Sequence, residues 1–218
     1  MSGVSLARPW LSFALEREMQ VLSWAINQPG FVMARRIVWR EVRNADLPKE
    51  RDVAAWLAQE LEAQKMQDAV AFLTSRDVSR FTDQSAKAGR TTARCIATVG
   101  LSNAERVGMR VNRQAQDRGT INIAVRLNTG LSRTALIEAL SIATQARTAA
   151  VIDEGVPLPR GLATGTGTDC IAVAAPVGPG DYAGLHTDVG EALGAAVYRA
   201  TLQGVTEWKS DSGSVQRG

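Results

Sequence analysis

The stretch GTINIAVRLNTGLSRTALIEAL, residues 119–140, predicts a strand followed closely by a helix. Residues 119–127 alternate apolar side chains (Ile121, Ile123, Val125, Leu127) with polar or small ones (Asn122, Ala124, Arg126), which is the period of a half-buried strand. Ser132 is a good N-cap for the helix, whose apolar side chains share one face (Leu136, Ile137, Leu140, Ala143). A strand followed by a helix in this way indicates a sheet with helices layered on it.

More strands and helices are predicted on both sides of this unit. Strands are expected at 10–15 and 19–25 (as a hairpin around the charged residues 16–18), 31–42, 69–73, 92–101 and 171–175. Helices are expected after Asp52 and from near Thr187 to about Gly204, and Ser75 is expected to cap a short helical turn. About seven strands and three main helices favour one α/β (α+β) domain with a mixed sheet, over residues 1–209, followed by a disordered tail at 210–218.

The composition is that of a soluble globular protein. The chain has 218 residues, 45% hydrophobic and 22% charged, with a net charge of +3. Its Lys and Arg residues are scattered, which argues against a nucleic-acid partner. We expect no membrane association and a cytoplasmic location, because the sequence shows no signal peptide and no apolar run near ~20 residues. Cys95 and Cys170 lie far apart in apolar stretches and are interpreted as reduced, buried thiols.

Two segments place polar side chains where strands meet loops. In residues 119–123, Thr120 and Asn122 are two apart and therefore point to the same face of the strand. The alternative is that they form the exposed polar face of an edge strand. The run ATGTGTDC, residues 163–170, is a loop dense in hydroxyl and N–H groups that can cradle an anion or a carbonyl oxygen. Asp169 enters the next strand, and its alternative role is a turn cap.

The third segment, residues 184–191, contains the single histidine of the chain. Thr187 is a good N-cap, Asp188 falls in the first helical turn, and His186 lies just outside the helix. Free N–H groups of that turn can bind an oxyanion beside His186. The alternative is a purely structural histidine.

In order and spacing, these three segments resemble the adenosylcobinamide amidohydrolases. Residues 98–103, including Ser102 and Asn103, are similar to the family's segment before its Gly-Thr-Ile-Asn run, and the helix with Ala139, Thr144 and residues 149–150 is also similar. The resemblance covers roughly residues 20–205. The chain departs from the family where residues 27–30 and Trp39 replace a Gly-rich segment and an Asn.

The resemblance implies hydrolysis of the amide that joins aminopropanol to the corrin propionate arm of adenosylcobinamide, with adenosylcobyric acid as product. The partner is then a small-molecule corrinoid, which is substrate rather than cofactor, and no cofactor or resident metal is expected. Whether the chain forms a homo-oligomer is left open.

Amide hydrolysis requires an activated nucleophile, an oxyanion donor and an acid for the leaving amine. We expect His186 to carry protons, because its reference pKa lies near 6.5. Asp169 or Glu191 is expected to orient it or to act as the base. The predicted substrate-binding residues come from the same segments: Thr120, Asn122, Ser102, Asn103, Thr164, Thr166, Thr168 and Thr187. All of these roles require the three segments to share one cleft.

Four alternatives remain at this point. One is a metal-assisted route with Asp169, Asp188, Glu191 and His186 as ligands. Another is self-cleavage before Thr120, as in N-terminal-nucleophile amidohydrolases. The third is a non-catalytic corrinoid-binding protein, and the fourth is an amidohydrolase acting on a different amide.

Overall fold

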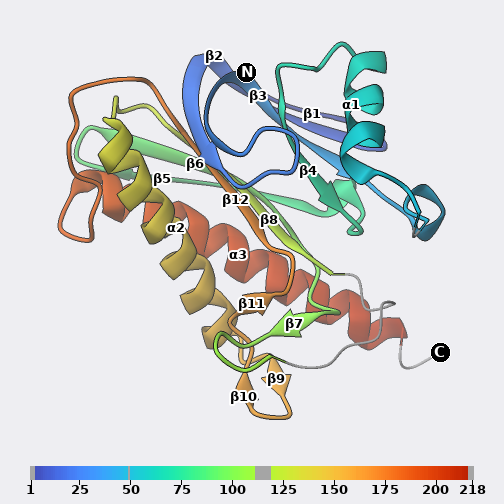
Figure 1. The fold of residues 1–218 in the computed structure, drawn as a ribbon. Coiled ribbons are helices and arrows are strands. Elements are labelled where there is room, and N and C mark those ends of the chain that lie inside the picture. Colours follow the sequence, from blue (N-terminus) through green and yellow to red (C-terminus); the bar gives the residue numbers. More distant parts are fainter. Residues whose placement is uncertain (1–2, 49, 111–118, 216–218) are drawn as a thin grey trace.

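A mixed eight-stranded sheet organises the chain (Figure 1). The computed structural model describes residues 3–48, 50–110 and 119–215. The strand order is β4-β3-β2-β12-β8-β6-β5, with β1 paired to β2. The strands are β1 (Val4–Ala7), β2 (Trp10–Ser23), β3 (Gly30–Glu41), β4 (Val70–Thr74), β5 (Phe81–Ala88), β6 (Thr91–Val99), β8 (Ile121–Leu127) and β12 (Cys170–Ala175). Two small ribbons pair β7 (Ala104–Glu105) with β11 (Gly165–Thr166) and β9 (Pro157–Leu158) with β10 (Gly161–Leu162).

Three α-helices in the described part of the chain cover the sheet. The helices α2 (Arg133–Asp153) and α3 (Asp188–Val215) lie side by side below β5, β6, β8 and β12 in Figure 1, and α1 (Val53–Ala63) packs beside β3 and β4. Two short 3₁₀ turns occur at Asn44–Asp46 and Val78–Arg80. The predicted single α+β domain with a mixed sheet is therefore confirmed.

The sheet bends around a second core. On its helix-free face, apolar side chains from β2, β3, β4, β6, β8 and β12 form one cluster, which includes Phe13, Ile37, Phe72 and Ala172. The bend is located in β2, whose pairing with β3 shifts between Ala14 and Met19. The predicted hairpin of residues 10–25 is therefore wrong. The charged residues 16–18 form an exposed irregularity within one long strand, and pairing resumes beyond it.

The predicted helix starts are confirmed by their caps. The side chains of Asp52 and Ser132 accept hydrogen bonds from the backbone N–H groups of Ala55 and Ala135. The N–H of Gly190 donates to Thr187 Oγ1 at 2.9 Å. Ser75 does not cap the turn after β4, because Asp77 takes that position.

The predicted end of the last helix is wrong. α3 continues past Gly204 to Val215, so residues 210–215 are helical rather than part of a disordered tail; residues 216–218 lie outside the described part. Asp211, in this extension, forms an ion pair with Arg76 at 2.6 Å. Arg76 lies just after β4, so this ion pair helps to hold the last turns of α3 against the sheet.

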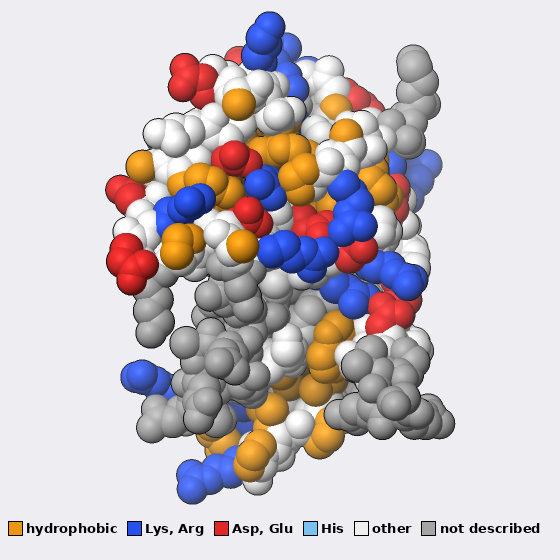
Figure 2. Space-filling view, turned by 90° about the vertical axis from the view of Figure 1, so that its right-hand side faces the viewer, with side chains coloured by type: hydrophobic (Ala, Val, Ile, Leu, Met, Phe, Trp, Pro, Cys, Tyr) orange, Lys and Arg blue, Asp and Glu red, His pale blue; other side chains and the backbone are white. Residues whose placement is uncertain are grey.

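α2 is the one described helix that is long and apolar enough in composition to cross a membrane. Its apolar side chains, however, lie in the core between the sheet and α3 (Leu136, Ala139, Ile142, Ala143, Val151). Core packing therefore accounts for this composition. Figure 2 shows the face at the right of Figure 1, where Lys and Arg lie among Asp and Glu rather than in one basic patch.

Candidate functional site

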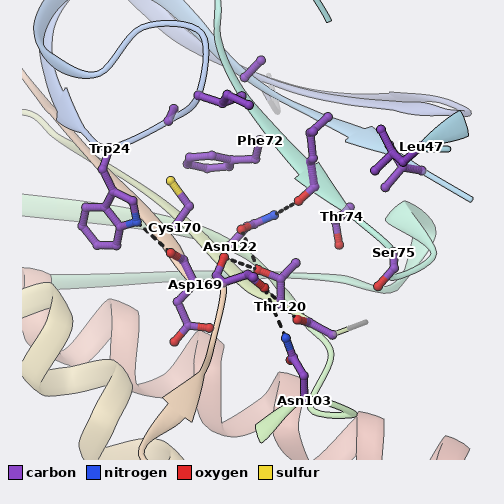
Figure 3. A pocket seen from close by; sticks show the side chains of 17 residues that line it. Trp24, Leu47, Phe72, Thr74, Ser75, Asn103, Thr120, Asn122, Asp169 and Cys170 are labelled. Atoms are coloured by element: carbon purple, nitrogen blue, oxygen red, sulfur yellow. Dashed lines mark hydrogen bonds between the residues drawn. The ribbon is translucent and has the colours of Figure 1, made fainter. Parts of the chain in front are cut away.

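A cavity of about 510 Å³ opens where the parallel strands β8 and β12 begin (Figure 3). Asn122 pairs in register with Cys170 at this point, and the C-terminal end of β4 forms the opposite wall. The cavity is lined by Trp24, Ala25, Ile26, Val42, Leu47, Ala71, Phe72, Leu73, Thr74, Ser75, Asn103, Gly119, Thr120, Asn122, Thr168, Asp169 and Cys170. The predicted first and second segments therefore meet in one cleft.

Thr120 and Asn122 form the polar floor of the cavity. Thr120 Oγ1 donates to Asn122 Oδ1 at 3.2 Å and to the carbonyl of Thr168 at 2.8 Å. Asn122 Nδ2 donates to the carbonyl of Leu73 at 2.7 Å, which ties β8 to β4. The two side chains share one face as predicted. The edge-strand alternative is wrong, because β8 lies between β6 and β12.

Gly119 immediately precedes this floor and allows a close approach. Its carbonyl accepts a hydrogen bond from Thr168 Oγ1 at 3.0 Å, and Asn103 Nδ2 in turn donates to that hydroxyl at 3.4 Å. A Cβ atom at residue 119 would lie 2.8 Å from both the Gly100 carbonyl oxygen and the Ser102 nitrogen. Only glycine fits here, and Ser102 contributes to the site by this packing rather than by lining the cavity.

Asp169 turns its carboxylate away from the cavity. Side chains alternate along a strand, so the side chain of Cys170 lines the cavity while that of Asp169 points toward α2 (Figure 3). There it forms a buried ion pair with Arg147, and burial lowers the pKa of Arg147. Its oxygens also accept hydrogen bonds from the backbone N–H groups of Ile121 at 3.1 Å and Thr166 at 3.0 Å. Asp169 therefore acts as a clamp that joins the starts of two strands to α2.

The glycine-threonine loop, residues 163–170, folds around the Asp169 carboxylate. Thr166 donates both its N–H and its hydroxyl to Asp169. Thr164 Oγ1 accepts from the N–H of Val107 at 2.8 Å and so holds the ribbon of β7 and β11. Neither hydroxyl lines the cavity. Of the loop's threonines, Thr168 is the one that reaches it.

An apolar wall and mouth complete the site. Trp24 and Ile26 are each 47% exposed although they line the cavity. The indole N–H of Trp24 donates to the carbonyl of Asp169 at 2.7 Å, which fixes the ring at the entrance. Phe72 and Leu73 of β4 form the opposite wall. Burial raises the pKa of Cys170 to about 12, so its thiol stays protonated near neutral pH.

The third predicted segment lies at the other end of the sheet. β12 leads from the cavity through its six residues, about 20 Å of strand, to the loop that carries His186. There the N–H of Ala183 donates to Glu138 Oε2 of α2 at 2.7 Å, and Asp188 packs against Gly89 in the β5–β6 turn.

The expectation that the imidazole shares the cleft with Thr120 and the glycine-threonine loop is therefore wrong within one chain. His186 and Glu191 are exposed, and Thr187 caps α3. The pattern at residues 184–191 correctly predicted the start of a helix. That helix start lies far from the cavity, because it follows the opposite end of β12.

The metal-assisted alternative is not supported by the donor set. Its four ligands are split between the two ends of the sheet, because Asp169 lies at the cavity and the other three near the start of α3. In the described residues, no three His, Cys, Asp or Glu side chains come together as a metal-binding group.

Several cavity residues were not anticipated from the sequence. Trp24 and most of β4 fall in segments predicted only as apolar strands, at 19–25 and 69–73, and Ile26 lies just past the first of them. The burial of Arg147 could have been predicted from the sequence, because it is a lone cation among alanines on α2 (Ala143, Ala146, Ala149, Ala150). A cation buried there requires an acidic partner.

The two places where the chain departs from the family pattern, residues 27–30 and Trp39, lie outside the cavity and pack against its β4 wall. Trp39 is fully buried, with its ring 5.2 Å from that of Phe72. Asn27 hydrogen-bonds to the backbone at the start of β4, donating to the carbonyl of Ala69, just before the strand, at 2.8 Å and accepting from the Ala71 N–H at 3.0 Å. Both residues position β4 rather than line the cavity.

Part of the chain is similar to a curated protein. Over 92 residues the chain is 37% identical to the uncharacterized protein MJ1613 of Methanocaldococcus jannaschii. The match covers 40% of this chain and 36% of that protein, so the chain spans about a third of the length of the curated relative.

Two solved structures resemble the fold at low identity. The PH0078 protein of Pyrococcus horikoshii OT3 is 10% identical with a TM-score of 0.46, over 91% of this chain and 77% of that one. A Burkholderia sp. beta-aminopeptidase is 11% identical with a TM-score of 0.43, over 91% and 78%. Residues 2–213 match the family described as CbiZ, adenosylcobinamide amidohydrolase. The chain that forms this cavity therefore belongs to the adenosylcobinamide amidohydrolase family.

Proposed function

We propose that the protein hydrolyses the aminopropanol amide of adenosylcobinamide to give adenosylcobyric acid for corrinoid salvage. The family match supports amidohydrolase chemistry of cobinamide salvage. The observation that carries the proposal in the structure is the floor of the cavity, where the buried Thr120 hydroxyl and Asn122 amide meet at 3.2 Å. Hydroxyl and amide groups at the end of an otherwise apolar cavity fit an amide-bearing arm.

The substrate is proposed to bind arm-first. A cavity of about 510 Å³ is of the size that holds an extended side arm, within the usual 300–1,000 Å³ of ligand sites. The much wider corrin ring then stays at the entrance, against the exposed parts of Trp24 and Ile26. The aminopropanol amide reaches the floor at Thr120. This arrangement explains why large apolar side chains remain exposed beside a polar floor.

The floor supplies two of the three chemical requirements. In this proposal the Thr120 hydroxyl, which lines the cavity, is the nucleophile. Asn103 and Asn122 line the cavity, and each amide NH₂ carries two N–H groups, so that one can donate to a developing oxyanion while the other keeps its present partner. One such donor typically lowers the barrier by ~3 kcal/mol. The source of the base is taken up in the next subsection.

The test is to incubate the purified protein with adenosylcobinamide and to follow adenosylcobyric acid and free aminopropanol by mass spectrometry. Asn122→Ala should reduce kcat/KM by about 100-fold, because an oxyanion donor and the link to β4 are both lost. Asn128→Ala is the matched control: it removes the same side chain just past the other end of β8, where the exposed amide accepts from the Thr92 N–H at 2.7 Å. This control should keep wild-type turnover.

Binding of adenosylcobinamide without release of aminopropanol would overturn the hydrolytic function and favour a corrinoid-binding protein. Release of a different amine from another amide, with adenosylcobinamide untouched, would overturn the substrate assignment.

A further inference from the structure

We infer that Thr120 cuts the chain at the Gly119–Thr120 peptide bond, and that the α-amine released on Thr120 is the base for amide hydrolysis at this cavity. The second half rests on the proposed function, whereas the first half does not depend on any substrate.

The cavity lacks another base among its described lining residues. Its titratable side chains are Asp169 and Cys170. The Asp169 carboxylate points toward α2, where Arg147 and two backbone N–H groups occupy it. The Cys170 thiol stays protonated at neutral pH. An α-amine has a reference pKa of about 7.7–8.0, which suits a general base near neutral pH, and a threonine can be activated by its own terminal amine.

The structure around the Gly119–Thr120 peptide bond favours nucleophilic attack on the Gly119 carbonyl carbon. The carbonyl of Gly119 accepts the hydrogen bond from Thr168 Oγ1 at 3.0 Å, which polarises it and can stabilise an oxyanion on it. Asn103 supports that hydroxyl, and its own Oδ1 is buried without a hydrogen-bond partner in the described part of the chain. The close approach at residue 119 excludes any side chain larger than hydrogen and so keeps this carbonyl in place.

The new terminus would remain fixed after the cut. The Thr120 carbonyl accepts from the Gly100 N–H at 2.9 Å, and the Ile121 N–H donates to Asp169. β8 is paired with β6 from Ile121 onward and with β12 from Asn122 onward. The amine and the hydroxyl of Thr120 would therefore stay together at the cavity floor, which is only 6% exposed at this residue.

The steps balance with water as the sole co-reactant. Thr120 Oγ1 forms a bond to the Gly119 carbonyl carbon, the C–N bond breaks, and the hydroxyl proton passes through water to the leaving nitrogen. Water then hydrolyses the ester, leaving a carboxylate on Gly119 and a free amine and hydroxyl on Thr120. In turnover, the amine takes the hydroxyl proton as Oγ1 attacks the substrate amide. The proton leaves with aminopropanol, and water releases the acid from the Thr120 ester.

The experiment measures intact mass and N-terminal sequence of the purified protein before any substrate is added. Two chains are expected, one ending at Gly119 and one beginning with Thr120, whose masses together exceed the 23.3 kDa of the uncut chain by one water. Thr120→Ala should stay uncut and inactive, and Thr120→Ser should be cut. Thr168→Val should be cut more slowly, seen as uncut chain that disappears over time. Thr134→Ala, which removes an exposed hydroxyl on α2, is the control and should be cut like the wild type.

Thermal unfolding of each variant separates a loss of cutting from a loss of folding, and the wild-type mass does not depend on any variant. Uncut wild-type protein that hydrolyses adenosylcobinamide would overturn this inference and leave the proposed function standing. Cut protein that releases no aminopropanol would overturn the proposed function and leave self-cleavage standing.

Discussion

Arg147 on α2 and Asp169 at the start of β12 form a buried ion pair that joins the helix layer to the cavity floor. Their side chains are only 13% and 7% exposed. The Asp169 carboxylate also holds the N–H of Ile121, so that one side chain sets the positions of both β8 and β12. The pair therefore links helix packing to the geometry of the proposed chemistry.

Removing one charge of this pair should destabilise the fold more than removing both. Asp169→Asn leaves Arg147 buried without its counter-charge, which we expect to cost about 3–5 kcal/mol of the free energy of unfolding. The double variant Asp169→Asn with Arg147→Met should be more stable than the sum of the two single changes predicts. Urea unfolding of the four proteins measures this. Additive changes would show that the two side chains are not coupled.

His186→Ala should keep turnover close to that of the wild type. The imidazole is exposed near the start of α3, at the opposite end of β12 from the cavity. We therefore expect kcat and KM for adenosylcobinamide to change little, and the pH profile to keep its shape. A loss of several hundred-fold in kcat with unchanged unfolding would mean that the imidazole reaches a reacting group, for example across two copies of the chain.

Changes at the cavity mouth should affect substrate binding more than the chemical step. Ile26→Ser removes an apolar surface proposed to contact the corrin ring, so KM should rise severalfold while kcat stays near wild type. Ile137→Ser is a matched control, because Ile137 is exposed at 55% on α2 and lies outside the cavity lining. An equal rise in KM for both variants would place the corrin ring elsewhere.

The sequence predicted the fold better than the site, and the reason is topological. Local patterns indicated a strand over residues 119–127, of which Ile121–Leu127 forms β8. They also indicated the caps at Asp52, Ser132 and Thr187, because hydrogen-bonding side chains and alternation act over a few residues. Whether two polar loops meet depends instead on strand direction. β8 and β12 are parallel, so their starting ends bring Thr120 and Asp169 together, and the helix start at His186 follows the far end.

The predictions for Asp169 and for β2 were wrong for the same reason, which is that local sequence patterns do not show how distant segments pair. A carboxylate next to a strand can point to either face, and only the register with β8 shows that Asp169 faces α2. In β2, the charged residues 16–18 are typical of a turn, but continued pairing of Met19 with Ala34 keeps the strand going. Both outcomes depend on partners fifteen or more residues away in the chain.

The two free thiols should make the fold less stable at alkaline pH. Cys95 is buried as predicted, whereas Cys170 is half-buried because it lines the cavity. Burial raises the pKa of Cys170 from its usual value of about 9.0 to about 12, and raises that of Cys95 as well. Below pH 9 the thiol is protonated in both the folded and unfolded states and contributes no pH dependence. Between pH 9 and about pH 12 the unfolded chain loses the proton and the folded chain keeps it, so the free energy of unfolding falls by up to about 1.4 kcal/mol per pH unit for each thiol.

Cys170→Ala should make the free energy of unfolding fall less steeply above pH 9, by up to about 1.4 kcal/mol per pH unit, because one titrating thiol is removed. Below pH 9 the pH dependence should stay close to that of the wild type. Urea unfolding at pH 7, 9 and 10.5 measures the slope, and comparison with the wild type cancels the Tyr and Lys residues that titrate in the same range. In the same proteins, iodoacetamide should alkylate Cys170 of the folded chain at pH 8 far more slowly than that of the unfolded chain, because the thiolate is the reactive form. Rapid alkylation of the folded protein at Cys170 would mean that the cavity stabilises a thiolate, and Cys170 would then compete with Thr120 as the nucleophile.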